Sequence, residues 1–307
     1  MERVFGIPII AAVILGVVFP YQALVIMPLG FLFLFLMMTW AGLSVEWSRL
    51  RSSRNRVKEL MVGLSALYLF FPPLQWVLAR WLISDKQYLF GLLFASLTPA
   101  AIVAPFFTRI HDSDEELSFL IMVLSTLVCP VAVPLLLKLL AGPSIAFEMF
   151  SLVKFMVLLV SAPLLLSYAT ARFLPGVKRR LLPHMGLLNM LSLSVLIFIF
   201  FGNATSRLNL NYASVVSLAK ILLLVFVQDF GVLFLSRFVL APYFDRSRLN
   251  ALAITLSMKN VAIAAAVLLF YDPKAALPPA MAFIAHACLF NFIPLARGYF
   301  ASRKDRT

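Results

Sequence analysis

Ten apolar stretches, each long enough to cross a lipid bilayer, constrain the fold of this 307-residue chain. The hydrocarbon core of a bilayer needs about 20 apolar residues per helix, within a range of about 17–25. Hydrophobic residues make up 63% of the chain and charged residues 13%, whereas a soluble domain is about half apolar and about a quarter charged. The sequence therefore predicts an all-α polytopic membrane protein. The expected spans cover residues 5–24, 27–45, 60–83, 88–110, 115–141, 148–172, 186–204, 212–240, 249–271 and 276–299.

The basic residues are distributed unevenly between the loops. If the N-terminus is cytoplasmic and the spans alternate, 18 of the 26 lysines and arginines fall on the cytoplasmic side and seven on the outer side, with Lys259 left inside a span. Cytoplasmic loops carry this excess in membrane proteins. We therefore expect a multi-pass cell-membrane protein with both termini in the cytoplasm and no cleavable signal peptide. The net charge of +13 then indicates contact with anionic lipid and no nucleic-acid partner.

Two halves of five spans, residues 1–145 and 146–307, are expected to form one transmembrane unit. An odd number of spans gives the halves opposite orientations, as in the inverted repeats of many secondary transporters. Pro105 and Lys259 lie 154 residues apart, and Asp114 and Asp272 lie 158 apart. The similar offsets support a repeat. Pro105 is expected to interrupt the fourth span, because proline lacks an N–H and clashes with the preceding turn.

The cysteines give no sign of a metal centre. Cys129 and Cys288 both lie in apolar runs, without a second cysteine or a histidine at ligand spacing. We expect two small buried apolar side chains and neither a metal nor another cofactor.

Several short motifs, in order along nearly the whole chain, resemble those of the bile acid:sodium symporter family. These are Gly42-Leu43-Ser44 followed by Trp47, then Pro99, then Asp114 with Leu117-Ser118, then Ser125-Thr126-Leu127 with Pro130 and Pro134-Leu135-Leu136, then Met258-Lys259-Asn260, and finally Pro278 with His286. The resemblance implies a panel domain of spans 1, 2, 6 and 7 and a core domain of spans 3–5 and 8–10. It also implies that spans 4 and 9 unwind and cross, and that substrate moves by elevator-type alternating access.

At the positions where this family binds sodium, the chain carries different residues. The resemblance places Ala104 and Pro105 at a Ser-Asn pair, Ser118 and Met122 at a Ser and a Thr, Thr255 at a Glu, Lys259 at a Gln, and Tyr68 at a Gln. Sodium needs oxygen ligands, and a thioether is a poor substitute. The sequence therefore predicts reduced or absent sodium coupling, with a proton as the other possible coupling ion.

Lys259 is the candidate residue on which the functional interpretation depends most. A charge at the centre of a membrane helix costs about 2.5–3.5 kcal/mol on insertion scales. Three roles are open for it. The ammonium replaces a sodium ion at the helix crossing, with or without Asp229 as ion-pair partner. Alternatively, the lysine carries a transported proton, or it is purely structural.

Other polar residues are candidates for the substrate site. Asn260 occupies the position of the family's cavity asparagine, and Thr255 and Ser257 precede it in the ninth span. Ala104, Pro105 and Thr108 in the fourth span, and Asn189 in the seventh, complete the candidates. Each hydroxyl or amide is alternatively satisfied within its own helix. His286 is either a hydrogen-bonded core histidine or a proton relay.

The leading functional hypothesis is a sodium-independent or weakly sodium-dependent secondary transporter, a symporter or carrier of a small, carboxylate-like organic anion. The alternative is a proton-coupled or uniporting carrier similar to auxin-efflux carriers. A membrane receptor or scaffold is a remote third. An enzyme is not expected, because Asp229 and His286 are the only acidic or histidine side chains within the spans apart from three glutamates at span ends, Glu115, Glu116 and Glu148. Neither the oligomeric state nor the substrate follows from the sequence.

Overall fold

The computed structural model of the chain describes residues 6–45, 54, 56–142, 148–207 and 212–289. Trp47, the basic residues Arg3, Arg49 and Arg51, and the end of the tenth expected span lie outside the described residues. Within them the fold is helical, and its only pairing of extended backbone is an isolated antiparallel bridge between Ala100 and Lys259.

Eight α-helices are described in the first half of the chain. They are α1 (Gly6–Val18), α2 (Pro20–Ile26), the 3-10 turn η1 (Met27–Leu29), α3 (Gly30–Ser44), α4 (Val57–Ser65), the π-helical turn η3 (Ala66–Phe70), α5 (Phe71–Leu82), α6 (Lys86–Leu97), α7 (Ala104–Ile110) and α8 (Glu115–Ala141).

The second half is also helical. It contains α9 (Met149–Met156), the π-helical turn η5 (Val157–Ser161), α10 (Ala162–Phe173), α11 (Pro175–Leu181), the 3-10 turn η6 (Leu182–His184), α12 (Met185–Arg207), α13 (Tyr212–Phe226), the π-helical turn η7 (Val227–Gly231), α14 (Val232–Leu240), α15 (Arg246–Ser257), α16 (Val261–Tyr271) and a helix over Leu277–Leu289.

Six continuous helical segments are long and apolar enough to cross a membrane, and three shorter apolar helices accompany them. The long ones are Pro20–Ser44, Val57–Leu82, Glu115–Ala141, Phe150–Phe173, Pro175–Ser206 and Val215–Leu240. The fourth and ninth expected spans are each split into two shorter helices, α6 with α7 and α15 with α16. The chain is thus a polytopic helical membrane protein, as the sequence predicts.

Two helix boundaries differ from the expectation. The first break falls at Phe19, so α1 is only 13 residues long and the next helix starts at Pro20. In the fourth span, the interruption covers residues 98–103 and precedes Pro105, which sits in the first turn of α7. A proline is tolerated there because the first N–H groups of a helix have no intrahelical partner. Pro99 lies within the break, after the extended Thr98, as the residue before a proline favours.

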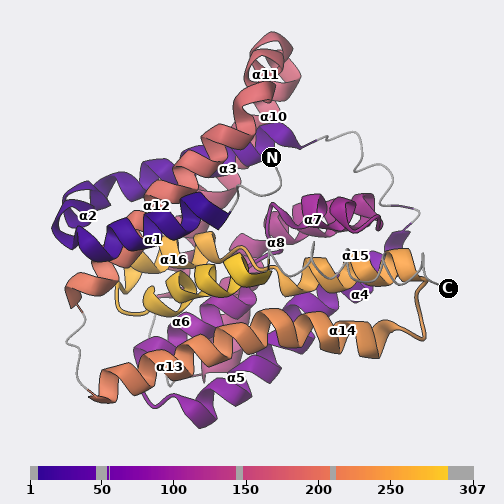
Figure 1. Cartoon of the computed structure of the whole chain (residues 1–307). Helices are drawn as coiled ribbons and strands as arrows, with labels where there is room; N and C mark the ends of the chain where they lie inside the picture. The colour runs from indigo at the N-terminus through magenta and orange to yellow at the C-terminus, as the bar shows by residue number, and fades with distance from the viewer. Residues whose placement is uncertain (1–5, 46–53, 55, 143–147, 208–211, 290–307) are drawn as a thin grey trace, which may run out of the picture.

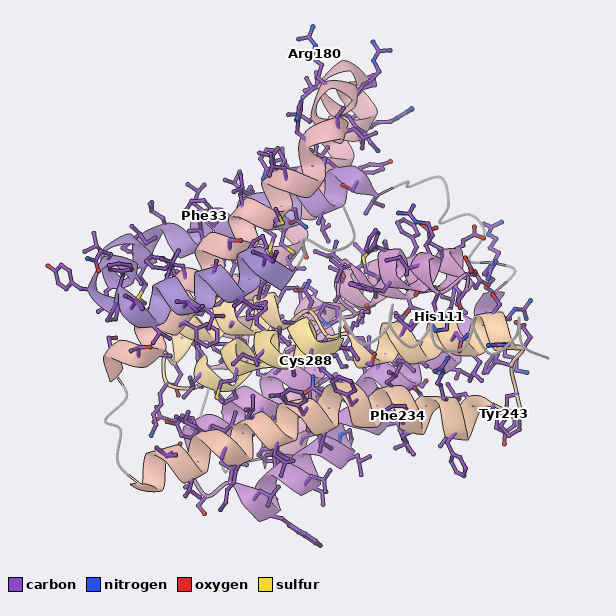
Figure 2. The ribbon with its side chains drawn as sticks, in the orientation of Figure 1. Phe33, His111, Arg180, Phe234, Tyr243 and Cys288 are labelled. Atoms are coloured by element: carbon purple, nitrogen blue, oxygen red, sulfur yellow. The ribbon has the colours of Figure 1, made fainter. Side chains whose placement is uncertain are left out.

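The helices pack mainly in two groups (Figure 1). In one group, α12 packs along α1, α2 and α3, and α10 packs against α3. In the other, α5 packs on α6, α8 on α7 and α15, and α14 on α15. α16 contacts α12, α3 and α6, and therefore lies where the groups meet. Helix α11 projects from the bundle, and Figure 2 shows Arg180 at its tip.

Ion pairs and hydrogen bonds connect helices at both ends of the group that contains α5, α6, α8, α14 and α15. At one end Arg56 pairs with Asp114 and Glu116, and the Arg248 guanidinium donates to Glu59 over 2.8 Å. At the other end Lys274 pairs with Asp85 at 2.6 Å. Asp85, Asp114 and Asp245 also cap α6, α8 and α15, because each carboxylate accepts from backbone N–H groups of the first turn. The polar ends leave an apolar middle, which suits a bilayer. Cys129 on α8 is buried as expected, whereas Cys288 on the helix Leu277–Leu289 is exposed, so the prediction of a buried side chain is wrong for Cys288.

Candidate substrate and ion site

The two interrupted helices meet at their breaks. The Ala101 N–H donates to the Met258 carbonyl over 2.7 Å, and the Asn260 N–H donates to the Pro99 carbonyl over 2.8 Å. These bonds flank the Ala100–Lys259 bridge. Backbone polar groups inside a membrane must be paired within the protein, and this short ladder pairs those that the helix breaks release.

Four helix ends converge on this crossing. Helices α6 and α15 end there, and α7 and α16 begin there. The end of a helix carries partial negative charge and its start carries partial positive charge. The crossing therefore presents both signs of backbone charge beside each other in the interior of the protein, where low polarity strengthens their effect.

A cavity of about 130 Å³ borders the crossing. Its wall combines both helix groups, with Lys259 and Asn260 from the crossing and Asn189 from α12 as polar members. The remaining lining residues are Ile9, Met37, Ala101, Ile102, Val103, Gly186, Met190, Leu193, Val261, Ala262, Phe283 and His286. A largely apolar cavity with a few convergent polar groups is the usual form of a small-molecule site.

Two amide side chains at this cavity have unused hydrogen-bonding atoms. Asn260 is 5% exposed, and its Nδ2 has no protein partner. The Oδ1 atom of Asn189, on the opposite wall, is likewise buried and unpartnered. An unpaired buried polar atom costs about 1–3 kcal/mol. A polar solute between the two walls would satisfy both amides.

Lys259 is 1% exposed, and its Nζ donates to the Leu67 carbonyl over 2.9 Å. Leu67 belongs to the π-helical turn η3. Such a turn displaces carbonyls from the regular helix ladder and is frequent at functional sites. Lys259 Nζ thus donates to a freed carbonyl of the third span, rather than to the carbonyls at the ends of α6 and α15.

Asp229, the partner considered for Lys259, pairs with a different residue. It lies in the second π-helical turn of the same group, η7, and is completely buried. Its Oδ2 is 3.3 Å from His286 Nε2, which is close enough for an ion pair but not aligned for a hydrogen bond. Of the described residues, His286 is the only one at ion-pair distance from Asp229. The tertiary structure therefore replaces a Lys259–Asp229 pair by an Asp229–His286 pair.

The positions that the resemblance matches to sodium ligands lie together, but their oxygens are occupied. Thr255 Oγ1 donates to the Ala251 carbonyl and is 2.6 Å from Ser118 Oγ. The Met122 carbonyl accepts from Thr126 Oγ1 at 2.7 Å and from Ser125 Oγ at 3.0 Å. The Tyr68 hydroxyl donates to the Ser125 carbonyl at 2.7 Å. These contacts tie α8 to α15 and to η3.

The remaining sequence candidates do not line the cavity. Ala104 and Pro105 are buried at the start of α7, and Thr108 Oγ1 donates to the Ala104 carbonyl at 2.9 Å. Ser257 Oγ donates to the Ile254 carbonyl at 2.9 Å. With Thr255, they pack within the crossing rather than against the cavity. The apolar lining, including Met190 and Phe283, carries no sequence signal, because such side chains are the commonest in any membrane helix.

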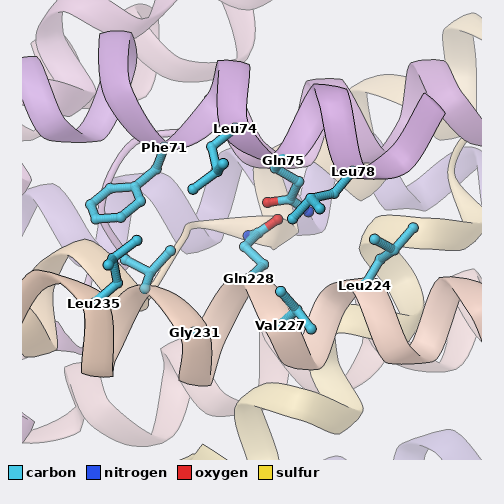
Figure 3. Close-up of a pocket in the computed structure, with 10 residues that line it drawn as sticks. Phe71, Leu74, Gln75, Leu78, Leu224, Val227, Gln228, Gly231 and Leu235 are labelled. Atoms are coloured by element: carbon cyan, nitrogen blue, oxygen red, sulfur yellow. The ribbon is translucent and has the colours of Figure 1, made fainter. Parts of the chain in front are cut away.

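A second cavity, of about 100 Å³, lies between α5 and the α13–α14 segment. Gln75 and Gln228 point toward each other across it (Figure 3). Both are buried, and Gln75 Nε2 and both amide atoms of Gln228 have no protein partner. The rest of the lining is apolar, so this cavity has no charged group to bind an ion.

Apolar helices that break and cross beside a central cavity define a class, the membrane secondary transporters. The comparison with known families agrees, because residues 31–210 match the model of the Sodium Bile acid symporter family. The chain belongs to this family, which confirms the resemblance read from the motifs. The match ends before Asp229, Lys259 and Asn260.

A curated relative is similar over part of its length. The uncharacterized protein YbaS of Bacillus subtilis is 26% identical over 132 residues, which cover 42% of this chain and 43% of YbaS. The chain therefore matches less than half the length of that relative.

Proposed function

We propose that the protein transports a small organic anion, with Lys259 standing in for a coupled cation. The observation that carries the proposal is the buried Lys259 at a crossing of two broken helices beside a cavity with unpaired amides. A carboxylate accepts hydrogen bonds from Asn260 Nδ2 and is attracted by the start of α16. The cavity is smaller than the ~300–1,000 Å³ of typical drug-sized ligand sites, so the substrate is a small acid.

The proposed architecture has ten spans in two inverted halves. The two crossing bonds support it, because an offset of 159 residues converts the bond from Ala101 to Met258 into the bond from Asn260 to Pro99. Other features recur at similar offsets. The turns η3 and η7 start 161 residues apart, and the capping residues Asp85 and Asp245 lie 160 apart.

The proposed mechanism is elevator-type alternating access. The group of α1–α3 and α9–α12 is the panel, and the group of α4–α8, α13–α16 and the final helix is the core. The cavity between them is lined from both sides, so sliding of the core along the panel exposes a bound anion to each membrane face in turn. Both termini are proposed to lie in the cytoplasm of a cell-membrane protein, on the basis of the basic loops.

Reduced or absent sodium coupling is part of the proposal. A sodium ion at the matched positions would meet the ammonium of Lys259 and hydroxyls already engaged in Thr255 and Ser118. Like charges at contact distance repel, and a thioether at Met122 supplies no oxygen ligand.

A thermal-shift screen tests the proposal. The purified full chain is heated with lactate, malate, 2-oxoisovalerate and benzoate, with sodium or choline as the cation. A bound acid raises the unfolding temperature in proportion to the logarithm of its concentration over Kd. We expect at least one acid to stabilise equally in both salts. A shift that requires sodium would overturn the role of Lys259, and no shift with any acid would argue against an anion site.

A converse variant sharpens this test. Thr255→Glu with Lys259→Gln restores the residues that the resemblance expects at two sodium positions. We expect this variant to gain sodium-dependent stabilisation by the acid, whereas Thr255→Gln with Lys259→Gln, its matched control without the carboxylate, does not. Sodium responses that are identical in the two variants would contradict the assignment of these positions.

A further inference from the structure

We infer that Asp229 and His286 form a proton-binding site that couples anion transport to proton movement. The inference rests on the proposed function, because it names the coupling ion of the same cycle. It gives a role to two buried ionisable residues that neither the anion site nor Lys259 uses.

Both residues belong to the core, and His286 lies beside the cavity. Asp229 is fully buried on η7, and His286 is 3% exposed on the helix Leu277–Leu289. Their 3.3 Å contact joins the eighth and tenth expected spans. His286 lines the cavity together with Asn189 and Asn260, whereas Asp229 is not part of that lining. The imidazole therefore contacts the carboxylate on one side and the anion cavity on the other.

Lys259 is the titratable group that interacts with the pair, Cys129 interacts with Lys259, and Tyr68 interacts with Cys129. Lys259 is near enough to attract Asp229 electrostatically, although its Nζ is bonded to Leu67. The buried thiol of Cys129 on α8 interacts with Lys259, and the Tyr68 hydroxyl on η3 donates to Ser125. Neither the thiol nor the phenol is charged near neutral pH when unperturbed. When protonated, Lys259 is therefore the positive charge that balances an ionised Asp229.

The charges of this group sum to zero when Lys259 is protonated, Asp229 is ionised and His286 is neutral. A charged Lys259 and an ionised Asp229 cancel, so a monovalent anion in the cavity adds one net negative charge to the membrane interior. Unbalanced charge is costly there. One proton on His286 removes the imbalance, so the empty carrier and the carrier loaded with anion and proton are both neutral. Histidine suits this role because its charge changes between about pH 5 and 8.

The transport step requires no other reactant. On the acidic side, a proton from water bonds to the unprotonated ring nitrogen of His286, and the imidazolium is attracted by Asp229 and by the anion. After the core moves, that N–H bond breaks, the proton returns to water, and the anion leaves. A monocarboxylate is thus carried with one proton and without net charge.

Transport in proteoliposomes tests the inference. The probes are radiolabelled lactate, malate and the acid that gives the largest thermal shift, with protein-free vesicles to subtract passive entry. Counterflow against internal unlabelled acid, without ion gradients, reports anion transport alone. An inward proton gradient then reports coupling. In the wild type we expect both, with gradient-driven lactate accumulation that does not respond to membrane potential.

His286→Gln separates the two readouts. We expect the ratio of proton-driven accumulation to counterflow to fall at least tenfold, and the remaining transport to follow an inside-positive potential because the anion now moves alone. The matched control is His184→Gln, because His184 is exposed in the turn before α12 and should behave as wild type. Proton-driven accumulation retained in His286→Gln would overturn the inference and leave the proposed function intact.

A second measurement does not depend on transport, and it can be made even if His286→Gln does not fold. The chain has three histidines, so NMR of histidine-labelled protein resolves His286 by comparison with His286→Gln or with a His111→Gln/His184→Gln variant. We expect its signal to respond to pH and this response to change in Asp229→Asn. A His286 signal that does not respond to pH would overturn the proton site. Absent counterflow with every probe would instead refute the proposed function.

Discussion

At the scale of single residues, Lys259 pairs a desolvation cost with a clear functional prediction. Its ammonium is buried with one hydrogen bond to a carbonyl, which compensates only part of the desolvation of a charge. We expect Lys259→Met to leave the unfolding temperature unchanged or raised while counterflow falls at least tenfold. Lys220→Met, which removes an exposed lysine of α13, is the matched control. Full counterflow in Lys259→Met would show that the lysine has no part in transport.

The ion pair of Asp85 and Lys274 predicts a pH dependence of stability. Burial favours a raised pKa for Asp85, but the hydrogen bond from Lys274 and two backbone N–H groups outweigh it and lower the pKa. The stability that the ionised Asp85 contributes is present above its ordinary pKa of 3.8 and is lost as the pH falls through the lowered pKa. The same bond raises the pKa of Lys274, whose contribution is present below 10.5 and is lost as the pH rises through the raised pKa.

We therefore expect Asp85→Asn to lower the unfolding temperature at pH 7, where both groups are charged. The loss should be small, up to about 1 kcal/mol, because both side chains are partly exposed. Thermal scans of the wild type and the variant from acidic to neutral pH measure the difference. It should vanish at pH values below the lowered pKa of Asp85, and a difference that persists there would point to the helix cap instead of the ion pair.

At the scale of secondary-structure elements, the crossing depends on one hydroxyl from α8. The Ala100 N–H donates to Ser125 Oγ over 3.2 Å. Ser125→Ala leaves this N–H buried and unpaired, and we expect it to destabilise the protein by about 1–3 kcal/mol in thermal unfolding. Ser96→Ala is the control, because the Ser96 hydroxyl only donates to the Leu93 carbonyl of its own helix. Equal losses in the two variants would contradict the anchoring role of Ser125.

Helix α6 approaches the turn after α16 more closely than a side chain allows. A Cβ at Gly91 would lie 2.1 Å from the Ala275 carbonyl oxygen, which is backbone and cannot move aside. Gly91→Ala should therefore destabilise by about 1–3 kcal/mol, as overpacking does. Gly176→Ala in α11 has no heavy atom within 4 Å and should be neutral or stabilising by up to about 1 kcal/mol. Thermal unfolding of both variants checks this close approach.

At the scale of the whole molecule, the proposed elevator requires relative movement of panel and core. Asn189 and Asn260 face the same cavity from the two groups. In a background without Cys129 and Cys288, cysteines at both positions joined by a bifunctional thiol reagent should abolish counterflow, and a reducible reagent should allow recovery. Each single cysteine variant, treated in the same way, is the control. Undiminished transport by the cross-linked protein would exclude movement between these walls.

The sequence by itself determined the features that depend on local composition. Apolar length specified a membrane-spanning helical chain, because lipid tolerates neither charges nor unpaired backbone. Pro105 predicted a break in the fourth span, and the observed break lies a few residues before it. Lys259 identified a polar centre in an apolar span, because a buried charge is informative wherever it packs.

Which distant groups meet depends on how the helices pack in the tertiary structure. Asp229 pairs with His286 instead of Lys259, and Lys259 binds a carbonyl that is free because the third span widens into a π-helical turn at Leu67. Neither the turn nor the pairing has a local sequence signal. Contacts between residues far apart in the chain depend on how whole helices rotate and pack, and a rotation of one residue position turns a side chain about 100° around the helix axis. That rotation separates a cavity residue from one that faces lipid.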